Sequence, residues 1–82
     1  MVITFSELRD KEVINTCDGK RLGYICDARI DCESGKLCSV SVPQKGFLNA
    51  FKKNAYIDIP WSCICRIGND LVLVQLDTKL KG

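Results

Sequence analysis

Histidine is absent from this chain of 82 residues. Its absence removes the commonest general base of enzymes and excludes Cys–His and Ser–His–Asp arrangements. A glycine-rich phosphate loop is missing too, because Gly19, Gly23 and Gly35 stand apart and each fits a turn or a bulge. Asp27 and Asp31 could form a carboxylate pair on one strand, but solvated charges near a turn are the commoner explanation. We therefore expect that the protein is not an enzyme and needs no cofactor.

Long apolar runs are also missing. No stretch of 18 apolar residues is present, so no transmembrane segment is expected. The first residues lack the basic stretch and the apolar run of a signal peptide, and we therefore expect a cytoplasmic protein. The net charge is only +2, from 12 Lys and Arg against 10 Asp and Glu. Such a mild balance does not favour a nucleic-acid partner.

What the chain does contain is a series of short apolar runs separated by turn signals. Its length suits one domain, which we place at residues 1–77, followed by a polar tail at residues 78–82. The runs cover residues 2–5, 11–16, 21–32, 37–42, 55–67 and 71–76. This spacing predicts an all-β fold, a small barrel or sandwich of about six strands. Closure into a barrel is favoured because it leaves no sticky sheet edges.

Alternation within these runs predicts which side chains face the core. In residues 21–32 the inward set would be Leu22, Tyr24, Cys26, Ala28, Ile30 and Cys32, unless a bulge reverses part of it. In residues 55–67 the corresponding set contains Ile57, Ile59, Trp61, Cys63, Cys65 and Ile67. Residues 71–76 are apolar on both faces apart from Gln75. This last run predicts either a covered barrel wall or a subunit contact, and a homodimer is thus a second expectation.

The segment QKGFLNAFKKN, residues 44–54, does not alternate. It predicts one short helical turn or loop near residues 46–53. Three large apolar side chains within a basic rim suit a protein-docking or membrane-surface patch, although they could instead close one end of the barrel. Phosphate contact with base stacking, as in an RNA- or ribosome-associated module, is a further alternative. The candidate partner-binding residues are Lys45, Phe47, Leu48, Phe51, Lys52 and Lys53.

Six cysteines are many for a chain of this length. Disulfides are not expected in a reducing compartment, so the thiols are either free or bound to a metal. Cys63 and Cys65 lie one residue apart on one strand face, and Cys26, Cys32 and Cys38 share the inward parity, so four thiolates could converge on zinc or iron. No Cys-x-x-Cys pair supports this, and free cysteine behaves as a small apolar residue. We therefore expect Cys63 and Cys65 in the core and no bound metal. Cys17, beside a turn, is the candidate for redox sensing.

The order of several short motifs resembles the photosynthetic-reaction-centre (PRC) barrel superfamily. These motifs are Ser6-Glu7-Leu8 with Lys11-Glu12-Val13, Asp18-Gly19 with Leu22-Gly23, and Ile59-Pro60-Trp61 followed by Ile67-Gly68 and residues 72–74. Over residues 3–76 the chain is similar to the small YlmC/YmxH-type sporulation proteins of endospore-forming bacteria. The resemblance implies a small β-barrel of about six strands and no catalytic residues. The six cysteines are not part of the family pattern.

Relatives in that superfamily occur in the reaction-centre H subunit and in the ribosome maturation factor RimM, where the resemblance implies roles in assembly and interaction. We therefore expect a non-catalytic protein-interaction or adaptor module, associated with sporulation. A thiolate metal-binding protein and an RNA- or ribosome-associated module are the two alternatives. The partner is expected to be a protein.

Overall fold

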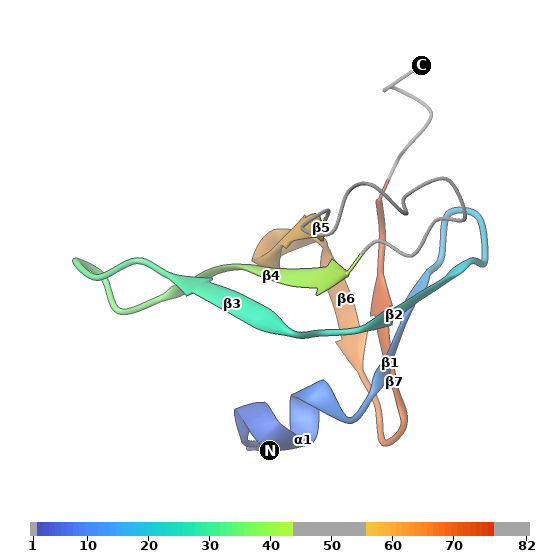
Figure 1. Cartoon of the computed structure of the whole chain (residues 1–82), viewed down its shortest axis with the longest axis horizontal. Helices are drawn as coiled ribbons and strands as arrows, with labels where there is room; N and C mark the ends of the chain where they lie inside the picture. The colour runs from blue at the N-terminus through green and yellow to red at the C-terminus, as the bar shows by residue number, and fades with distance from the viewer. Residues whose placement is uncertain (1, 44–55, 77–82) are drawn as a thin grey trace.

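A computed structural model describes residues 2–43 and 56–76 of the chain. Within them, the fold is mainly β, as predicted, with seven strands, a short helix and one 3-10 turn (Figure 1). The elements are α1 (Phe5–Arg9), β1 (Glu12–Asn15), β2 (Arg21–Tyr24), β3 (Asp27–Ile30), β4 (Leu37–Pro43), β5 (Tyr56–Pro60), η1 (Trp61–Cys63), β6 (Ile64–Ile67) and β7 (Leu71–Val74). The helical turn predicted near residues 46–53 and the boundary predicted at residues 77–78 lie outside the described residues.

The strands form two sheets. The first has the order β2-β1-β7-β6, in which β1 and β7 are parallel, and the second has the order β3-β4-β5. In Figure 1 β2 and β3 follow one another along one curved stretch of backbone that leaves the first sheet and enters the second. A second crossing leads from β5 through η1 into β6. These two corners join the sheets around one core, whose fully buried side chains include Val13, Val40, Ile59 and Val72.

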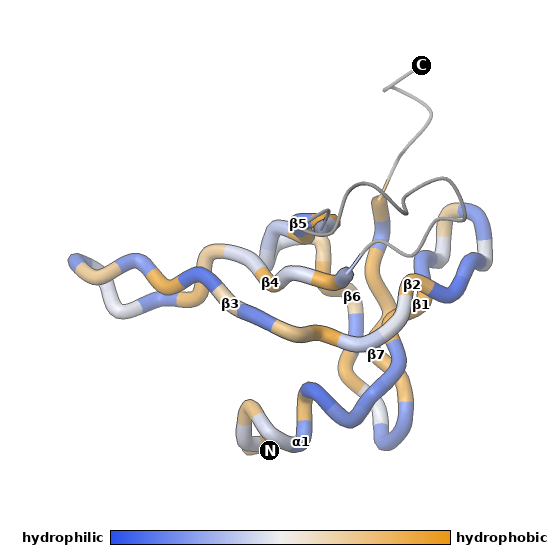
Figure 2. The backbone as a smooth tube through the Cα atoms, viewed as in Figure 1, coloured by the Kyte–Doolittle hydropathy of each residue, from blue (hydrophilic) through white to orange (hydrophobic). Residues whose placement is uncertain are grey.

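The turns lie where the sequence predicts them. Gly19 and Gly35 both have a positive φ, which glycine adopts without steric cost, and they follow Asp18 and Ser34 in the predicted turns. The turns after β1 and after β6 both contain hydrophilic stretches of the chain trace, as does the link between α1 and β1 (Figure 2). Pro43 is the last residue of β4, in agreement with its expected role as a strand terminator.

The first predicted strand, residues 2–5, is wrong. Residues 2–4 have no regular structure, and Phe5–Arg9 is helical. Thr4 is the N-cap of this helix, and its side chain and that of Glu7 form a capping box in which each accepts a hydrogen bond from the other's backbone N–H. The Thr-x-x-Glu spacing was readable in the sequence, but the apolar start of the chain favoured a strand.

The two long alternating runs are each broken at a corner. Between β2 and β3 the inward parity reverses, because Ile25 is only 2% exposed whereas Cys26 is exposed. Tyr24 and Ile30, which alternation placed in the core, are exposed as well. In the second run η1 interrupts the strand, so that Ile64 is half-buried and Cys65 is exposed. The predicted faces therefore fail around each corner, whereas Ala28 and Ile67 beyond the corners pack against the core as predicted.

Candidate docking site

A largely apolar cleft lies between α1 and the β3–β4 hairpin. It has a volume of about 560 Å³ and we call it the apolar groove. Figure 1 shows α1 beside this hairpin, with the amino terminus at the end of the helix. The apolar side chains lining the groove come from the α1 region (Ile3, Phe5, Leu8), from β3 and β4 (Ala28, Ile30, Leu37), from η1 (Trp61) and from the end of β6 (Ile67).

A capping box and a buried leucine fix the position of α1. The capping box closes the amino end, where the backbone N–H of Thr4 donates to Glu7 Oε1 at 2.7 Å and that of Glu7 donates to Thr4 Oγ1 at 3.1 Å. Leu8 is buried in the core and anchors the inner face of the helix. Phe5 stays 42% exposed, and the Arg9 guanidinium lies 5.9 Å from the centroid of its ring. The helix therefore presents an aromatic ring at the mouth of the groove.

The opposite wall presents Ile30 and Trp61. The register of β3 against β4 shifts between Arg29 and Ile30, and Ile30 is 61% exposed although it belongs to a strand. Trp61, the only tryptophan of the chain, begins η1 and is half-buried against the core. A small soluble protein leaves large apolar side chains exposed together mainly where something binds them. Phe5, Ile30 and Trp61 together therefore mark the groove as the candidate site.

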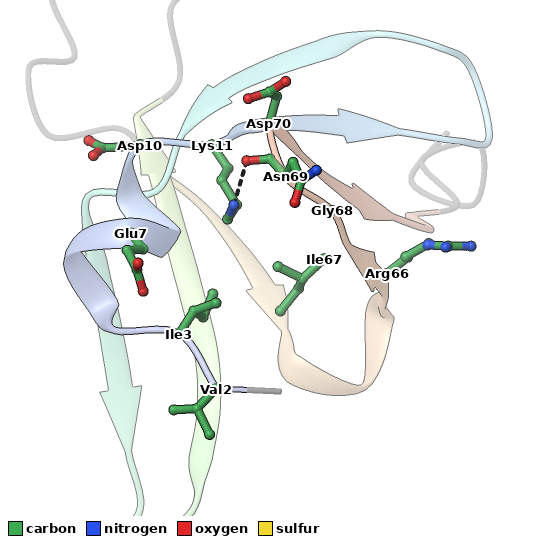
Figure 3. Close-up of a pocket in the computed structure, with 10 residues that line it drawn as sticks. All are labelled: Val2, Ile3, Glu7, Asp10, Lys11, Arg66, Ile67, Gly68, Asn69 and Asp70. Atoms are coloured by element: carbon green, nitrogen blue, oxygen red, sulfur yellow. Dashed lines mark hydrogen bonds between the residues drawn. The ribbon is translucent and has the colours of Figure 1, made fainter.

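A polar cleft of about 770 Å³ adjoins the apolar groove, since Ile3 and Ile67 line both (Figure 3). Lys11 lies at its centre and is 9% exposed. Its ammonium group donates a 2.5 Å hydrogen bond to the backbone oxygen of Asn69, which joins the α1–β1 junction to the β6–β7 turn. No carboxylate of the described residues lies within ion-pair distance of Lys11. Glu7, Asp10 and Asp70 line the same cleft.

A third cleft, of about 470 Å³, holds the polar side chains of the second sheet. Ser41 donates a 2.7 Å hydrogen bond to Asp58 Oδ1, and Arg29 lies 3.6 Å from Asp58 Oδ2. The hydroxyl, carboxylate and guanidinium groups therefore satisfy one another. Asp27 and Asp31, for which solvated charges were expected rather than a carboxylate pair, have separate partners: Asp27 accepts from the N–H of Ala28, and Asp31 accepts from the N–H of Glu33 in the β3–β4 turn.

The cysteines are not where alternation placed them. Cys26, Cys32, Cys38 and Cys65 are exposed, so their predicted core positions are wrong, whereas Cys17 is exposed as predicted. Cys63 is half-buried and packs against the core. The reversals at the two corners turn Cys26 and Cys65 outward. In the described residues, which include all six cysteines, no three His, Cys, Asp or Glu side chains are placed to hold one metal ion.

Two further predictions bear on interaction surfaces. The six candidate partner-binding residues between Lys45 and Lys53 lie outside the described residues. Strand β7 runs between β1 and β6, with Val72 and Val74 buried, Leu73 half-buried and Leu71 42% exposed. The homodimer that its apolar faces indicated stays a prediction. Among the described helices, none has the length and apolar character needed to cross a membrane.

The apolar groove was not predicted from the sequence. Its walls combine residues from near the amino terminus, from the β3–β4 hairpin and from the second corner, which are far apart in the chain. The one readable signal was the Thr4–Glu7 capping box, which would have placed a helix before β1. The sequence gives no comparable sign that Ile30 is exposed, because it continues a regular alternation.

Comparison with known proteins identifies the chain's relatives. A family model described as PRC-barrel domain matches residues 1–81. The chain is 38% identical over 76 residues to the probable sporulation protein YlmC of Bacillus subtilis, which covers 92% of this chain and 94% of that protein. It is 35% identical over 74 residues to an uncharacterized protein of Clostridium acetobutylicum (90% and 85%) and 26% identical over 77 residues to the uncharacterized protein YmxH of Bacillus subtilis (92% and 91%).

Proposed function

This chain belongs to the PRC-barrel family, and from this premise we propose that it acts as a non-catalytic adaptor that docks a segment of a partner protein in the apolar groove. The observation that carries the proposal is the joint exposure of Phe5 and Ile30 beside Trp61 in one cleft. Burial of such side chains supplies most of the affinity of protein interfaces, and tryptophan is among the residues that contribute most.

Three further observations support an adaptor rather than an enzyme. The chain contains no histidine. The polar side chains of Ser41, Asp58 and Arg29 are already engaged with one another, by a hydrogen bond and an ion pair. The groove itself is lined almost entirely by apolar side chains, with Thr4 and Asp27 as its polar members. Such a lining offers burial for a ligand and few groups that could act on it.

The similarity to the probable sporulation protein YlmC supports a role of this adaptor in sporulation. We place its action in the cytoplasm of a spore-forming cell, where it would hold a partner protein during spore formation. The groove side chains, rather than the cysteines, carry this role. Free exposed thiols add no binding energy comparable to that of buried aromatic and branched side chains.

Photo-crosslinking in sporulating cells tests the proposal. A benzoyl-phenylalanine in place of Ile30 is expected to give a discrete cross-linked protein. The same analogue in place of Tyr56, which is 51% exposed and lines neither the apolar groove nor the polar cleft, is expected to give none. Phe5→Ser in the Ile30-labelled chain should abolish the cross-link, because it removes the opposite wall of the groove. Leu71→Ser is the matched control, since Leu71 and Phe5 are both 42% exposed.

Urea unfolding of Phe5→Ser and Leu71→Ser shows whether both variants keep their fold. A cross-link from position 30 that survives Phe5→Ser in a folded protein would contradict docking in the groove. So would an identical product from position 56, because it would indicate unspecific adhesion of exposed apolar residues.

A further inference from the structure

The apolar groove and the polar cleft adjoin at Ile3 and Ile67, and we call the two together the trough. Glu7 of α1 lines the polar part while Phe5 lines the apolar part. A peptide segment longer than one or two residues that seats a side chain against Trp61 therefore also passes along the polar cleft. The groups of that cleft decide which residues can flank the apolar anchor.

Carboxylates predominate along this trough. Glu7, Asp10 and Asp70 line the polar cleft and Asp27 lines the apolar groove, against the two cations Lys11 and Arg66. Arg9 lines a different cleft, together with Asp10, but its guanidinium lies 5.9 Å from the centroid of the Phe5 ring. Even with Arg9 included, four carboxylates face three cations. The charge of the trough is therefore opposite in sign to that of the whole chain, which is +2.

The two cations of the trough differ in availability. Arg66 is exposed and extends outward in Figure 3, as Asp10 does. Lys11 is nine-tenths buried, and its ammonium group already donates to Asn69. By contrast, Asp10 and Asp70 are exposed, and within residues 2–43 and 56–76 their carboxylates make no hydrogen bond or ion pair. These two carboxylates are free to pair with an incoming cation.

We propose that the docked segment combines a large apolar side chain with flanking lysine or arginine residues. This inference rests on the proposed docking function and adds the chemistry of the partner. The apolar anchor fills the groove beside Trp61, and the flanking cations face Asp10 and Asp70. Apolar burial gives the affinity, whereas the charges fix the register and speed the encounter. The same carboxylates repel the phosphates of a nucleic acid, so the trough favours a protein segment over RNA.

Trp61 makes a direct test available. It is the only tryptophan of the chain and lines the groove, so its emission reports occupancy when the added peptides contain no tryptophan or tyrosine. We would titrate the full chain with three capped peptides, GKLFKG, GELFEG and GKSSKG, and repeat each titration by calorimetry. GKLFKG is expected to bind about tenfold more tightly than GELFEG at low salt, with the difference shrinking as salt screens the exposed pairs. GKSSKG should not bind.

Charge reversal in the trough provides the matched comparison. Asp70→Lys should remove the preference for GKLFKG, because the carboxylate facing the peptide cations becomes a cation. Glu33→Lys changes the net charge by the same amount in the β3–β4 turn, where the Glu33 side chain is exposed and lines none of these clefts. It should leave the preference unchanged, so that an effect of overall charge is separated from a local one.

The outcomes separate this inference from the function on which it rests. If GKLFKG and GELFEG bind equally, and both more tightly than GKSSKG, the charge inference is wrong and groove docking stands. If no peptide changes Trp61 emission or releases heat, both fail. Sedimentation of the protein without peptide tests whether a second copy of the chain fills the groove instead. In that case the protein would be a dimer that Phe5→Ser dissociates and Leu71→Ser does not. This result would overturn the proposal of a cationic partner segment.

Discussion

The side chain of Asn15 binds the backbone of Leu76 by two hydrogen bonds. Asn15 Nδ2 donates to the Leu76 carbonyl oxygen at 3.0 Å, and Asn15 Oδ1 accepts from the Leu76 N–H at 3.0 Å. The same oxygen accepts from the N–H of Cys17 at 3.1 Å. Asn15 is 1% exposed, so its amide continues the pairing of β1 with β7 inside the protein, beyond the last residue of β7. It thereby holds the end of the central strand pair closed.

We expect Asn15→Leu to destabilise the protein strongly. Leucine has the same branched arrangement of heavy atoms, although its methyl groups are larger, and it leaves two backbone N–H groups and one carbonyl oxygen without their partner. Each buried group left unsatisfied costs about 1–3 kcal/mol. The free energy of unfolding should fall by about 3 kcal/mol, a large part of the stability of a domain this small. Urea unfolding followed by Trp61 emission measures it.

Asn69→Ala is the control for that substitution. Asn69 is exposed, and in the described part of the chain only its backbone oxygen is engaged, by Lys11. Loss of the Asn69 side-chain amide should change the free energy of unfolding by less than about 0.5 kcal/mol. Equal effects of the two substitutions would contradict the role assigned to the Asn15 amide.

The capping box of α1 predicts a smaller effect. Thr4→Ala removes the oxygen that accepts from the Glu7 N–H, and loss of such a cap costs about 1 kcal/mol. Ser6→Ala is the control, because Ser6 is an exposed hydroxyl residue of the same helix and alanine favours helix. Urea unfolding should show the loss for Thr4→Ala alone. A Thr4→Ala protein as stable as the unsubstituted chain would mean that the cap does not hold the helix.

The sequence predicts the class of fold well because short alternating runs and turn residues are local signals. Asp18-Gly19 and the β3–β4 hairpin follow directly from them. The two corners between the sheets, by contrast, leave no local signal in the sequence. Where one long run leaves a sheet and enters the other, the backbone bends at Ile25 or at Trp61, and the inward parity reverses without any change in the pattern of residues. The wrong core positions of Cys26 and Cys65 both follow from such a bend.

The groove could not be predicted for a related reason. Phe5, Ile30 and Trp61 come together only when α1 packs beside the hairpin and η1 turns the chain back. In the sequence pattern, each of them alone is indistinguishable from an ordinary core residue of a strand. The basic and aromatic residues between Lys45 and Lys53 gave a stronger local signal, and their role stays a prediction because they lie outside the described residues.

Thiol reactivity tests the outward position of the cysteines. With five exposed thiols and a half-buried Cys63, a thiol reagent should modify five groups rapidly in the native protein and the sixth slowly, and all six rapidly in denaturant. Mass spectrometry of the time course counts them. Cys63→Ser should remove the slow group and leave five rapid ones. Two or more slow thiols in the native protein would contradict the outward positions of Cys26, Cys32, Cys38 or Cys65.

The β3–β4 turn predicts a dependence of stability on pH. The Glu33 N–H donates to Asp31 Oδ1 at 3.1 Å and the Ser34 hydroxyl donates to Oδ2 at 2.9 Å. These two hydrogen bonds hold the pKa of Asp31 below its usual value of 3.8. Because the folded-state pKa is the lower one, the ionised carboxylate stabilises the folded protein above pH 3.8, and this contribution disappears as the pH falls through the folded-state pKa.

Asp31→Asn removes the charge and keeps the shape of the side chain. Its single oxygen can still accept from the Glu33 N–H, while its NH2 group replaces Oδ2 and can donate to the Ser34 hydroxyl oxygen. The urea midpoint of the variant should lie below that of the unsubstituted chain at neutral pH, and the two should converge below pH 3.8. Glu33→Gln removes a neighbouring exposed carboxylate whose side chain makes no hydrogen bond in the described ranges, and it measures the general effect of one lost charge. A gap for Asp31→Asn that persists unchanged in acid would mean that the turn is stabilised by side-chain shape and not by the ionised carboxylate.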